Sequence, residues 1–111
     1  MKDSEFEKLT ITTSCMNRND MLVQTVPTWL EFPVKEIIIV DWNSSVPVYD
    51  TLKQNNITDK RIKIVRVVDQ KYYRHSLARN LKVELVNTEW VLSVDADVKV
   101  FKSFFDNVVL N

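Results

Sequence analysis

The stretch Glu36-Ile37-Ile38-Ile39-Val40-Asp41 decides the fold that we expect for this chain. Its four central residues form an uninterrupted, β-branched apolar run. A run of this kind suits a parallel strand that is buried on both faces of its sheet. Because parallel strands are joined by helical crossovers, helices are expected on both sides of such a sheet.

On either side of this run, the sequence predicts three more strands and four helices. The other predicted strands are Leu9–Thr13, Arg61–Val68 and Glu89–Asp95. The predicted helices are Asp20–Leu30, a short one capped by Ser44 or Ser45 with Pro47 in its first turn, Tyr73–Val86, and a last one from Lys102 to Leu110. This alternation of strands and helices predicts an α/β fold with right-handed crossovers.

Two of these helices carry more detailed expectations. In the first, Asn19 is the expected N-cap. Pro27 should kink or end that helix near Val26, because proline lacks the amide hydrogen that a helix needs. In the third helix, apolar residues recur every four positions and predict the buried face, namely Tyr73, Leu77, Leu81 and Leu85. Arg79 and Lys82 would then point away from that face.

The order of the elements predicts one Rossmann-like domain over residues 1–111. Its parallel sheet should have the strand order 3-2-1-4, with helices on both faces. Ligands of such sheets bind at the carboxyl ends of the strands, where the strand order reverses. Here that point lies between the first and fourth strands, so we expect a site formed by Ser14–Asn19 and Asp95–Val98.

Composition argues against several classes of function. The 15 basic residues balance the 15 acidic ones, whereas proteins that hold a nucleic acid by its backbone carry a basic excess. Glycine is absent, which excludes the glycine-rich phosphate loops of P-loop and dinucleotide-binding proteins. A phosphate ligand would therefore need a metal ion and side chains to neutralise it. With one cysteine and no apolar run long enough to span a bilayer, we expect a soluble, cytoplasmic protein.

Asp95-Ala96-Asp97 follows the fourth predicted strand and carries the strongest chemical signal. In an extended chain, residues i and i+2 point to the same side, so the two carboxylates would lie together. Carboxylate oxygens are among the ligands that Mg²⁺ and Mn²⁺ prefer in proteins. The alternative is a pair of solvated aspartates in a surface turn.

Five motifs, taken together and in this order, resemble family 2 glycosyltransferases of the GT-A fold. They are Thr10-Ile11-Thr12-Thr13, Asn17-Arg18-Asn19, Ile37-Ile38-Ile39-Val40-Asp41, His75-Ser76-Leu77-Ala78-Arg79-Asn80 and Asp95-Ala96-Asp97. The resemblance spans about Leu9 to Phe104 and implies the N-terminal, nucleotide-sugar-binding half of that fold. It also implies a nucleoside-diphosphate sugar as donor, often a UDP-sugar, and a divalent metal, Mn²⁺ or Mg²⁺.

The same resemblance implies roles for individual residues. Those matching donor-binding positions are Thr13, Ser14 and Asn17 beside the nucleoside, Asp41 at the base, and Arg79 and Asn80 in the third helix. Asp97 matches the direct metal ligand, while Asp95 would reach the metal, the ribose or a bound water.

Two further residues are candidates for the donor site. Trp42 stands where the family often has a second aspartate. It would either stack on the nucleobase or pack in the core, and in the latter case Asp41 would make the base contact. Arg74 falls at the start of the third helix, where a guanidinium could reach a phosphate. Its alternative is a surface arginine paired with a carboxylate.

Other functions stay open at this point. A hydrophobic strand followed by Asp95-Ala96-Asp97-Val98 also matches the nucleophile motif of haloacid-dehalogenase-like phosphatases, although residues 98–111 leave no room for that family's later motifs. A non-catalytic domain that binds nucleotides or another protein is the remaining alternative. Complete GT-A enzymes are longer, so we expect the catalytic base outside this chain, in the remainder of a longer enzyme or in a second copy of a homo-oligomer.

Overall fold

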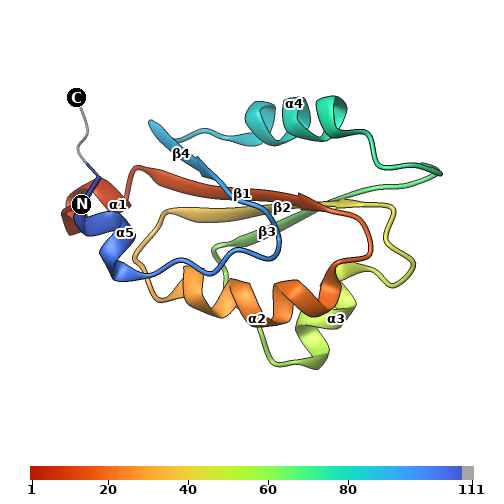
Figure 1. Cartoon of the computed structure of the whole chain (residues 1–111), viewed down its shortest axis with the longest axis horizontal. Coiled ribbons are helices and arrows are strands. Elements are labelled where there is room, and N and C mark those ends of the chain that lie inside the picture. The colour runs from red at the N-terminus through yellow and green to blue at the C-terminus, as the bar shows by residue number, and fades with distance from the viewer. Residues whose placement is uncertain (109–111) are drawn as a thin grey trace.

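The computed structural model describes residues 1–108, which contain a four-stranded sheet in the order β3-β2-β1-β4 (Figure 1). The strands are β1 (Leu9–Cys15), β2 (Glu36–Trp42), β3 (Ile62–Val67) and β4 (Trp90–Ser93). Every neighbouring pair runs parallel. The predicted strand order is therefore confirmed, and it reverses between β1 and β4.

Three helices cover the two faces of the sheet, as predicted. Figure 1 shows α2 (Asn19–Leu30) and α3 (Val48–Gln54) on one face and α4 (His75–Leu85) on the other. Two short helices, α1 (Asp3–Phe6) and α5 (Lys102–Asp106), lie together beside the start of β1 (Figure 1). Within residues 1–108, no helix is both long and apolar enough to cross a bilayer.

Strand β2 is buried along its whole length, as its apolar run predicts. Ile37 and Ile39 belong to the core on the side of α2 and α3. Val40 and Trp42 belong to a separate cluster beneath α4. A strand enclosed between two helical layers needs apolar residues on both faces, which is why its sequence shows no alternation.

The two faces of the sheet are covered unequally. The larger core lies on the α2 side, where Leu22, Val26 and Trp29 have no exposed surface. The smaller cluster consists of Val40, Trp42 and Ala78, with the partly buried Tyr73, Leu81 and Leu85 around it. Because α4 alone covers this second face, the β4 side chains on it, Val91 and Ser93, stay exposed.

Helix α2 continues through Pro27 to Leu30, so the expectation that the helix could end near Val26 is wrong. Pro27 is exposed. Water can therefore satisfy the Val23 carbonyl, which loses its helical partner when the amide hydrogen of residue 27 is missing. Buried Val26 and Trp29 on either side of the proline hold the last turn on the sheet.

The beginnings of α2 and α3 also differ from the prediction. Arg18 is the N-cap of α2, and Asn19 is its first helical residue. The Asn19 side-chain amide instead donates 2.8 Å to the carbonyl of Val46, which ties α2 to the segment before α3. Helix α3 begins at Val48 with Pro47 as its N-cap, rather than either preceding serine.

The predicted buried face of α4 is only partly correct. Ala78 and Lys82 are buried, whereas Leu77 is 44% exposed. A step of four residues advances about 40° beyond a full turn, so an apolar stripe drawn at that spacing drifts round the helix. The face turned to the sheet is instead centred on Ala78 and Lys82, and the expectation that Lys82 points to solvent is wrong.

Several element ends are shifted by one to four residues, and strand β1, for example, ends at Cys15 and not at Thr13. Strand β4 ends at Ser93, before the predicted end at Asp95. Helix α4 begins at His75, two residues after the predicted start. Helix α5 ends at Asp106, and the predicted end of that helix at Leu110 lies outside the described residues.

Candidate functional site

A groove opens at the carboxyl ends of β1 and β4, on the side of the sheet that α4 covers. Its volume is about 860 Å³, and its walls come from β1 and β4, from the segments that follow these strands, and from α4. The strand order reverses at this point, which is where the topology predicts a ligand site. Polar side chains that line the groove include Ser14, Asn17, Arg79, Lys82, Asp95 and Asp97.

Asp95 and Asp97 enter the groove from a tight turn after β4, not from the extended strand that the sequence predicts. Ala96 between them is buried, and its carbonyl accepts a 2.7 Å hydrogen bond from Thr25 Oγ1 on α2. The Val98 N–H donates to the Asp95 carbonyl at 3.1 Å and closes the turn. Because Ala96 takes the inward position, the carboxylates on either side are directed outward.

Helix α2 also anchors the chain that follows this turn. Trp29 Nε1 donates to the Val98 carbonyl at 2.9 Å, and the Val100 N–H donates to Thr28 Oγ1 at 3.2 Å. These contacts use backbone atoms of the segment after β4, so they fix the turn without engaging a carboxylate. The two aspartate side chains are exposed, and within residues 1–108 neither takes part in a salt bridge.

This pair of carboxylates fits a divalent ion that keeps water and phosphate among its ligands. Mg²⁺ takes oxygen ligands and is commonly held by one or two carboxylates together with substrate phosphates, and Mn²⁺ accepts similar ligands. Asp95 and Asp97 supply two such carboxylates to one groove. The described part of the chain has no cluster of three or more His, Cys, Asp or Glu side chains. The remaining ligands would therefore come from water and from the bound molecule.

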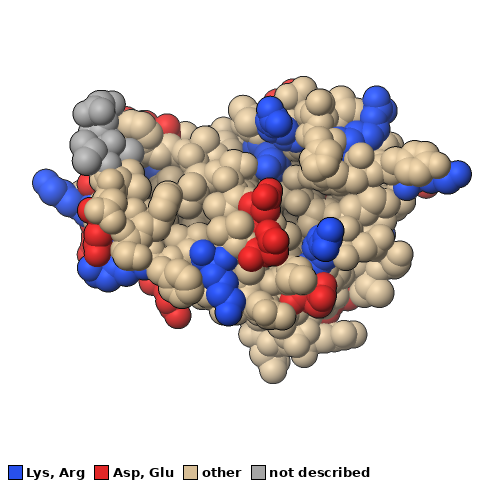
Figure 2. Space-filling view, in the orientation of Figure 1, with Lys and Arg blue, Asp and Glu red and all other residues tan. Residues whose placement is uncertain are grey.

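Basic side chains surround these carboxylates. Arg79 and Lys82 line the groove from α4, and Arg18 lines it from the segment after β1. Three cations against two carboxylates leave one positive charge when His75 is neutral. Figure 2 shows acidic side chains gathered in the middle of this face, with basic side chains around them. Such a site suits an anionic ligand that brings a metal ion with it.

Lys82 is a groove residue that was not predicted from the sequence. Its Nζ donates to Ser93 Oγ at 2.9 Å. Burial lowers the pKa of Lys82, the Asp95 carboxylate acts in the opposite direction, and the Arg79 charge adds to the lowering. The spacing of His75, Arg79 and Lys82, at i, i+4 and i+7, marks one side of a helix and was the available signal.

The wall next to β1 combines polar and aromatic side chains. The Ser14 hydroxyl is hydrogen bonded to the hydroxyl of Tyr73. The Tyr73 ring meets the His75 ring edge to face, with centroids 4.5 Å apart. Both rings line the groove, although neither was predicted there from the sequence.

The loop after β1 is tied to the loop after β2. The Asn17 N–H donates to Ser44 Oγ at 3.0 Å, and Asn17 Oδ1 accepts from the Ser45 N–H at 2.8 Å. In the second loop, Asn43 Nδ2 donates to the Gln70 carbonyl at 2.8 Å. Both asparagines have left-handed backbone conformations, with φ of 58° and 48°.

Asp41 and Trp42, which the resemblance places near the base, lie inside the protein. Asp41 is 1% exposed, and its carboxylate accepts hydrogen bonds from the Ser44 and Val48 N–H groups and from Arg66 Nη1. Trp42 is 3% exposed, and its Nε1 donates to a backbone carbonyl. In this arrangement the Asp41 carboxylate holds the β2–α3 connection, and the Trp42 indole holds the segment before α4 at Tyr72. Neither side chain lines the groove.

Three more residues expected at the donor do not line the groove. Thr13 is fully buried, and the residues before and after it line the groove, so its side chain faces the other side of the sheet. Arg74 is the exposed N-cap of α4. Asn80 is exposed on α4, one position beyond Arg79 and therefore turned away from the groove.

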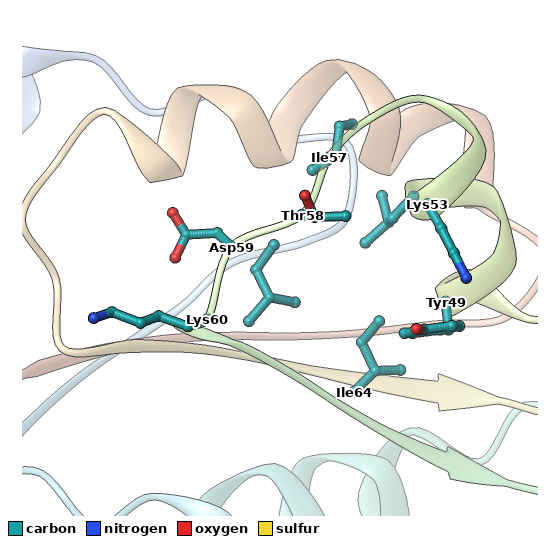
Figure 3. Close-up of a pocket in the computed structure, with 9 residues that line it drawn as sticks. Tyr49, Lys53, Ile57, Thr58, Asp59, Lys60 and Ile64 are labelled. Atoms are coloured by element: carbon teal, nitrogen blue, oxygen red, sulfur yellow. The ribbon is translucent and has the colours of Figure 1, made fainter.

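A second cavity, of about 530 Å³, lies between α3 and β3. Figure 3 shows aliphatic side chains such as Ile57 and Ile64 around it, while Asp59 and Lys60 direct their charged ends away from them. The Asp59 carboxylate is already paired with Arg61 Nη2 at 3.0 Å. This cavity therefore lacks the convergent, unpaired polar groups that the groove beside β4 contains.

The fold and the groove together define a Rossmann-like α/β protein with its candidate site at the strand ends. A family model described as Glycosyl transferase family 2 matches residues 10–110. The chain therefore belongs to glycosyl transferase family 2, as the sequence motifs predicted. This membership favours a glycosyltransferase over the phosphatase alternative.

A solved structure supports the assignment of the fold. The structure of residues 1–349 of TarS from S. aureus is similar to this chain, with a TM-score of 0.68 and 18% sequence identity. The similarity covers 90% of this chain and 30% of that one, so this chain spans about a third of its length. At this level of identity, the similarity shows the fold alone. A comparison with curated proteins gave no match.

Proposed function

We propose that the groove binds the diphosphate of a nucleoside-diphosphate sugar through Mn²⁺ or Mg²⁺, with Asp97 as the main metal ligand and Asp95 beside it. A UDP-sugar is the expected donor. The observation that carries this proposal is a pair of carboxylates on either side of buried Ala96, at the point where the strand order reverses, that form no salt bridge within residues 1–108. Membership of glycosyl transferase family 2 supports the same reaction class.

The charges of the groove suit this ligand. A diphosphate carries several negative charges, and the groove offers Arg18, Arg79 and Lys82 to meet them. The planar guanidinium of Arg79 can donate two parallel hydrogen bonds to phosphate oxygens. When bound, the divalent ion would neutralise the charge that develops on the departing diphosphate.

The chain's own residues would orient the donor. The nucleoside is expected at the wall formed by the loop containing Asn17 and by Ser14 and Tyr73, whose hydroxyls are hydrogen bonded to each other. The Thr25 contact to Ala96 keeps both carboxylates turned toward the groove. We propose that the acceptor site and the catalytic base lie outside residues 1–111, in the remainder of a longer enzyme or in a second copy, so that this chain forms one donor-binding domain.

Calorimetric titration with UDP, with and without Mn²⁺, tests the metal site. We expect tighter binding with Mn²⁺. Asp97→Ala should weaken binding in Mn²⁺ by about tenfold or more, the scale of a lost charge-assisted contact, and Asp95→Ala should weaken it less. Asp50→Ala removes an exposed aspartate of α3 that does not line the groove, so it is the matched control. Unchanged metal dependence in both groove variants would show that the metal site is wrongly assigned.

A second measurement concerns sugar transfer. Inverting transfer needs an oriented acceptor and a base that removes its proton. We therefore expect the isolated chain to bind the donor nucleotide, and at most to hydrolyse the donor slowly. Nucleotide release from a set of nucleoside-diphosphate sugars, with Mn²⁺ and with or without acceptors, checks this. Acceptor-dependent release by the monomer would place a base inside this chain and contradict the proposal.

A further inference from the structure

Lys82 differs from every other cationic side chain in the described part of the molecule because it is buried. Its side chain lies between α4 and β4 and is 9% exposed. The five basic residues that pair with carboxylates in the described chain are all more exposed than this, namely Lys8, Arg61, Lys63, Arg66 and Lys102. Burial of an ammonium group is unfavourable unless hydrogen bonds or opposite charges compensate it.

The protein compensates Lys82 only in part. An ammonium group has three N–H donors, and one of them donates to Ser93 Oγ. Asp95 is near enough to influence Lys82 electrostatically, yet within residues 1–108 no carboxylate forms a salt bridge with this ammonium.

The two buried acidic residues, Glu36 and Asp41, are compensated more completely than Lys82, because each has both a hydrogen-bond donor and a basic partner. Glu36 accepts a hydrogen bond from Thr10 and is paired with Lys63 at 2.7 Å. Asp41 accepts two backbone N–H groups and the Arg66 guanidinium. Two donors of Lys82 are thus left without a protein partner in the described chain, on a side chain that lines the groove.

The groups around Lys82 indicate which kind of ligand its two remaining N–H donors would bind. Arg79 lies one turn earlier on α4, and both side chains line the groove. Two neighbouring cations repel each other, so a neutral or cationic ligand would leave that repulsion in place. A phosphate group would relieve it and would accept hydrogen bonds from both side chains.

We infer that Lys82 is a further donor-binding residue, whose ammonium donates to a non-bridging phosphate oxygen of the nucleoside diphosphate from the α4 side of the groove. This inference rests on the proposed function. It adds a protein cation to the site, so Lys82 contributes to diphosphate binding with or without a metal ion. The Asp97 contribution, by contrast, depends on the metal.

The test compares UDP with uridine, in Mn²⁺ and in EDTA, for the wild-type chain and for Lys82→Met and Lys82→Arg. Lys82→Met should weaken UDP binding by about 10- to 100-fold, the scale of hydrogen bonds to charged groups. The loss should occur in both Mn²⁺ and EDTA, and uridine binding should stay unchanged. Lys82→Arg should restore most of the affinity for UDP. Lys35→Met is the matched control, because Lys35 is exposed and does not line the groove.

Thermal unfolding separates this role from a structural one. The folded-state pKa of Lys82 lies below its ordinary value, so as pH falls through that ordinary value the unfolded chain takes up the proton first. At neutral pH the charged lysine therefore disfavours the folded state, and Lys82→Met should keep or raise the unfolding midpoint. A purely structural lysine would lower the midpoint when it is replaced.

Each outcome has a defined meaning. Metal-dependent UDP binding that is equal in the wild type and in Lys82→Met would overturn this inference while the proposed function stands. Equal losses for UDP and uridine would also overturn it, because Lys82 would then shape the groove without contacting phosphate. If the wild-type chain binds no nucleotide with or without Mn²⁺, the proposed function and this inference both fail.

Discussion

Two strands of this sheet have aspartates at or just beyond their carboxyl ends, on the same edge, yet these aspartates have opposite environments. Asp41 follows the apolar run of β2 and is buried, with three hydrogen-bond donors on its carboxylate. Asp95 and Asp97 follow β4, are exposed, and line the groove. The same sequence pattern, an apolar strand followed by aspartate, therefore gives a structural residue in one place and candidate ligands in the other.

The difference comes from the donors that the surrounding chain supplies. At the end of β2, the carboxylate itself satisfies the backbone of the next turn, and Arg66 neutralises its charge. After β4, the turn is held by hydrogen bonds that the carbonyls of Ala96 and Val98 accept from side chains of α2, and its carboxylates take no part in them. Carboxylates that are not needed to hold their own turn are free to bind something else.

The largest expected effect tests whether the end of β2 is structural. Trp42→Ala should lower the free energy of unfolding by about 3–5 kcal/mol, because it leaves a cavity in the cluster under α4. UDP affinity per folded molecule should change little. Urea unfolding and calorimetry measure the two quantities, and Trp42→Phe should lose less stability. A loss of affinity with stability retained would instead support stacking of Trp42 on the nucleobase.

A smaller effect on stability is expected when the two kinds of aspartate are compared directly. Asp41→Ala should cost about 3 kcal/mol, since it leaves the Arg66 charge and two N–H groups without their partner. Breaking a buried ion pair costs about 3–5 kcal/mol, and the partial exposure of Arg66 places the cost for Asp41→Ala at the lower end of this range. Asp97→Ala should stay within about 0.5 kcal/mol of the wild type, as exposed substitutions usually do. Urea unfolding of both variants gives the comparison, which would fail if the two costs were equal.

An effect that appears only at alkaline pH, and is absent at neutral pH, is expected for Cys15, at the end of β1. Burial, and then the charge of Asp41, raises the pKa of Cys15 from 9.0 to about 12. The unfolded chain loses this proton first, so the Cys15 contribution to stability is present below pH 9 and is lost as the pH rises toward 12. Cys15→Ala should therefore show a shallower loss of stability over this range, measured by urea unfolding at several pH values.

The same cysteine also reports on the two kinds of aspartate. Asp41→Asn should lower the pKa of Cys15 and speed its alkylation in the folded protein, because it removes a nearby negative charge. Asp97→Asn should leave the alkylation rate unchanged. Faster alkylation in the second variant alone would contradict the electrostatic contact between Cys15 and Asp41.

Much of the fold follows from local patterns. The run from Ile37 to Val40 marks a strand buried on both faces, and the alternation of strands and helices then leads to the observed strand order. The strand order predicts where the groove lies, and Asp95 and Asp97 are among the residues expected to line it. These steps need only periodicity and the chirality of crossovers, which short stretches of sequence carry.

The roles of Asp41 and Lys82 depend on contacts that no local pattern contains. Arg66 stands opposite Asp41 in the register of β2 and β3, so their pairing becomes visible only once the strands are aligned. Lys82 is buried because α4 is oriented with Ala78 facing the sheet, and Lys82, one turn later, lies on the same face of the helix. A sequence shows which residues are present, but the rotation of a helix on its sheet decides which of them face the ligand.

The left-handed asparagines beside the groove affect the entropy of binding. Glycine would adopt the backbone conformations of Asn17 and Asn43 more easily, yet the chain contains none. An asparagine there also uses its side chain to fix the neighbouring loop, as Asn17 does with Ser45 and Asn43 does with Gln70. These loops are thus already ordered before a ligand arrives, so little binding free energy is spent on restricting their motion.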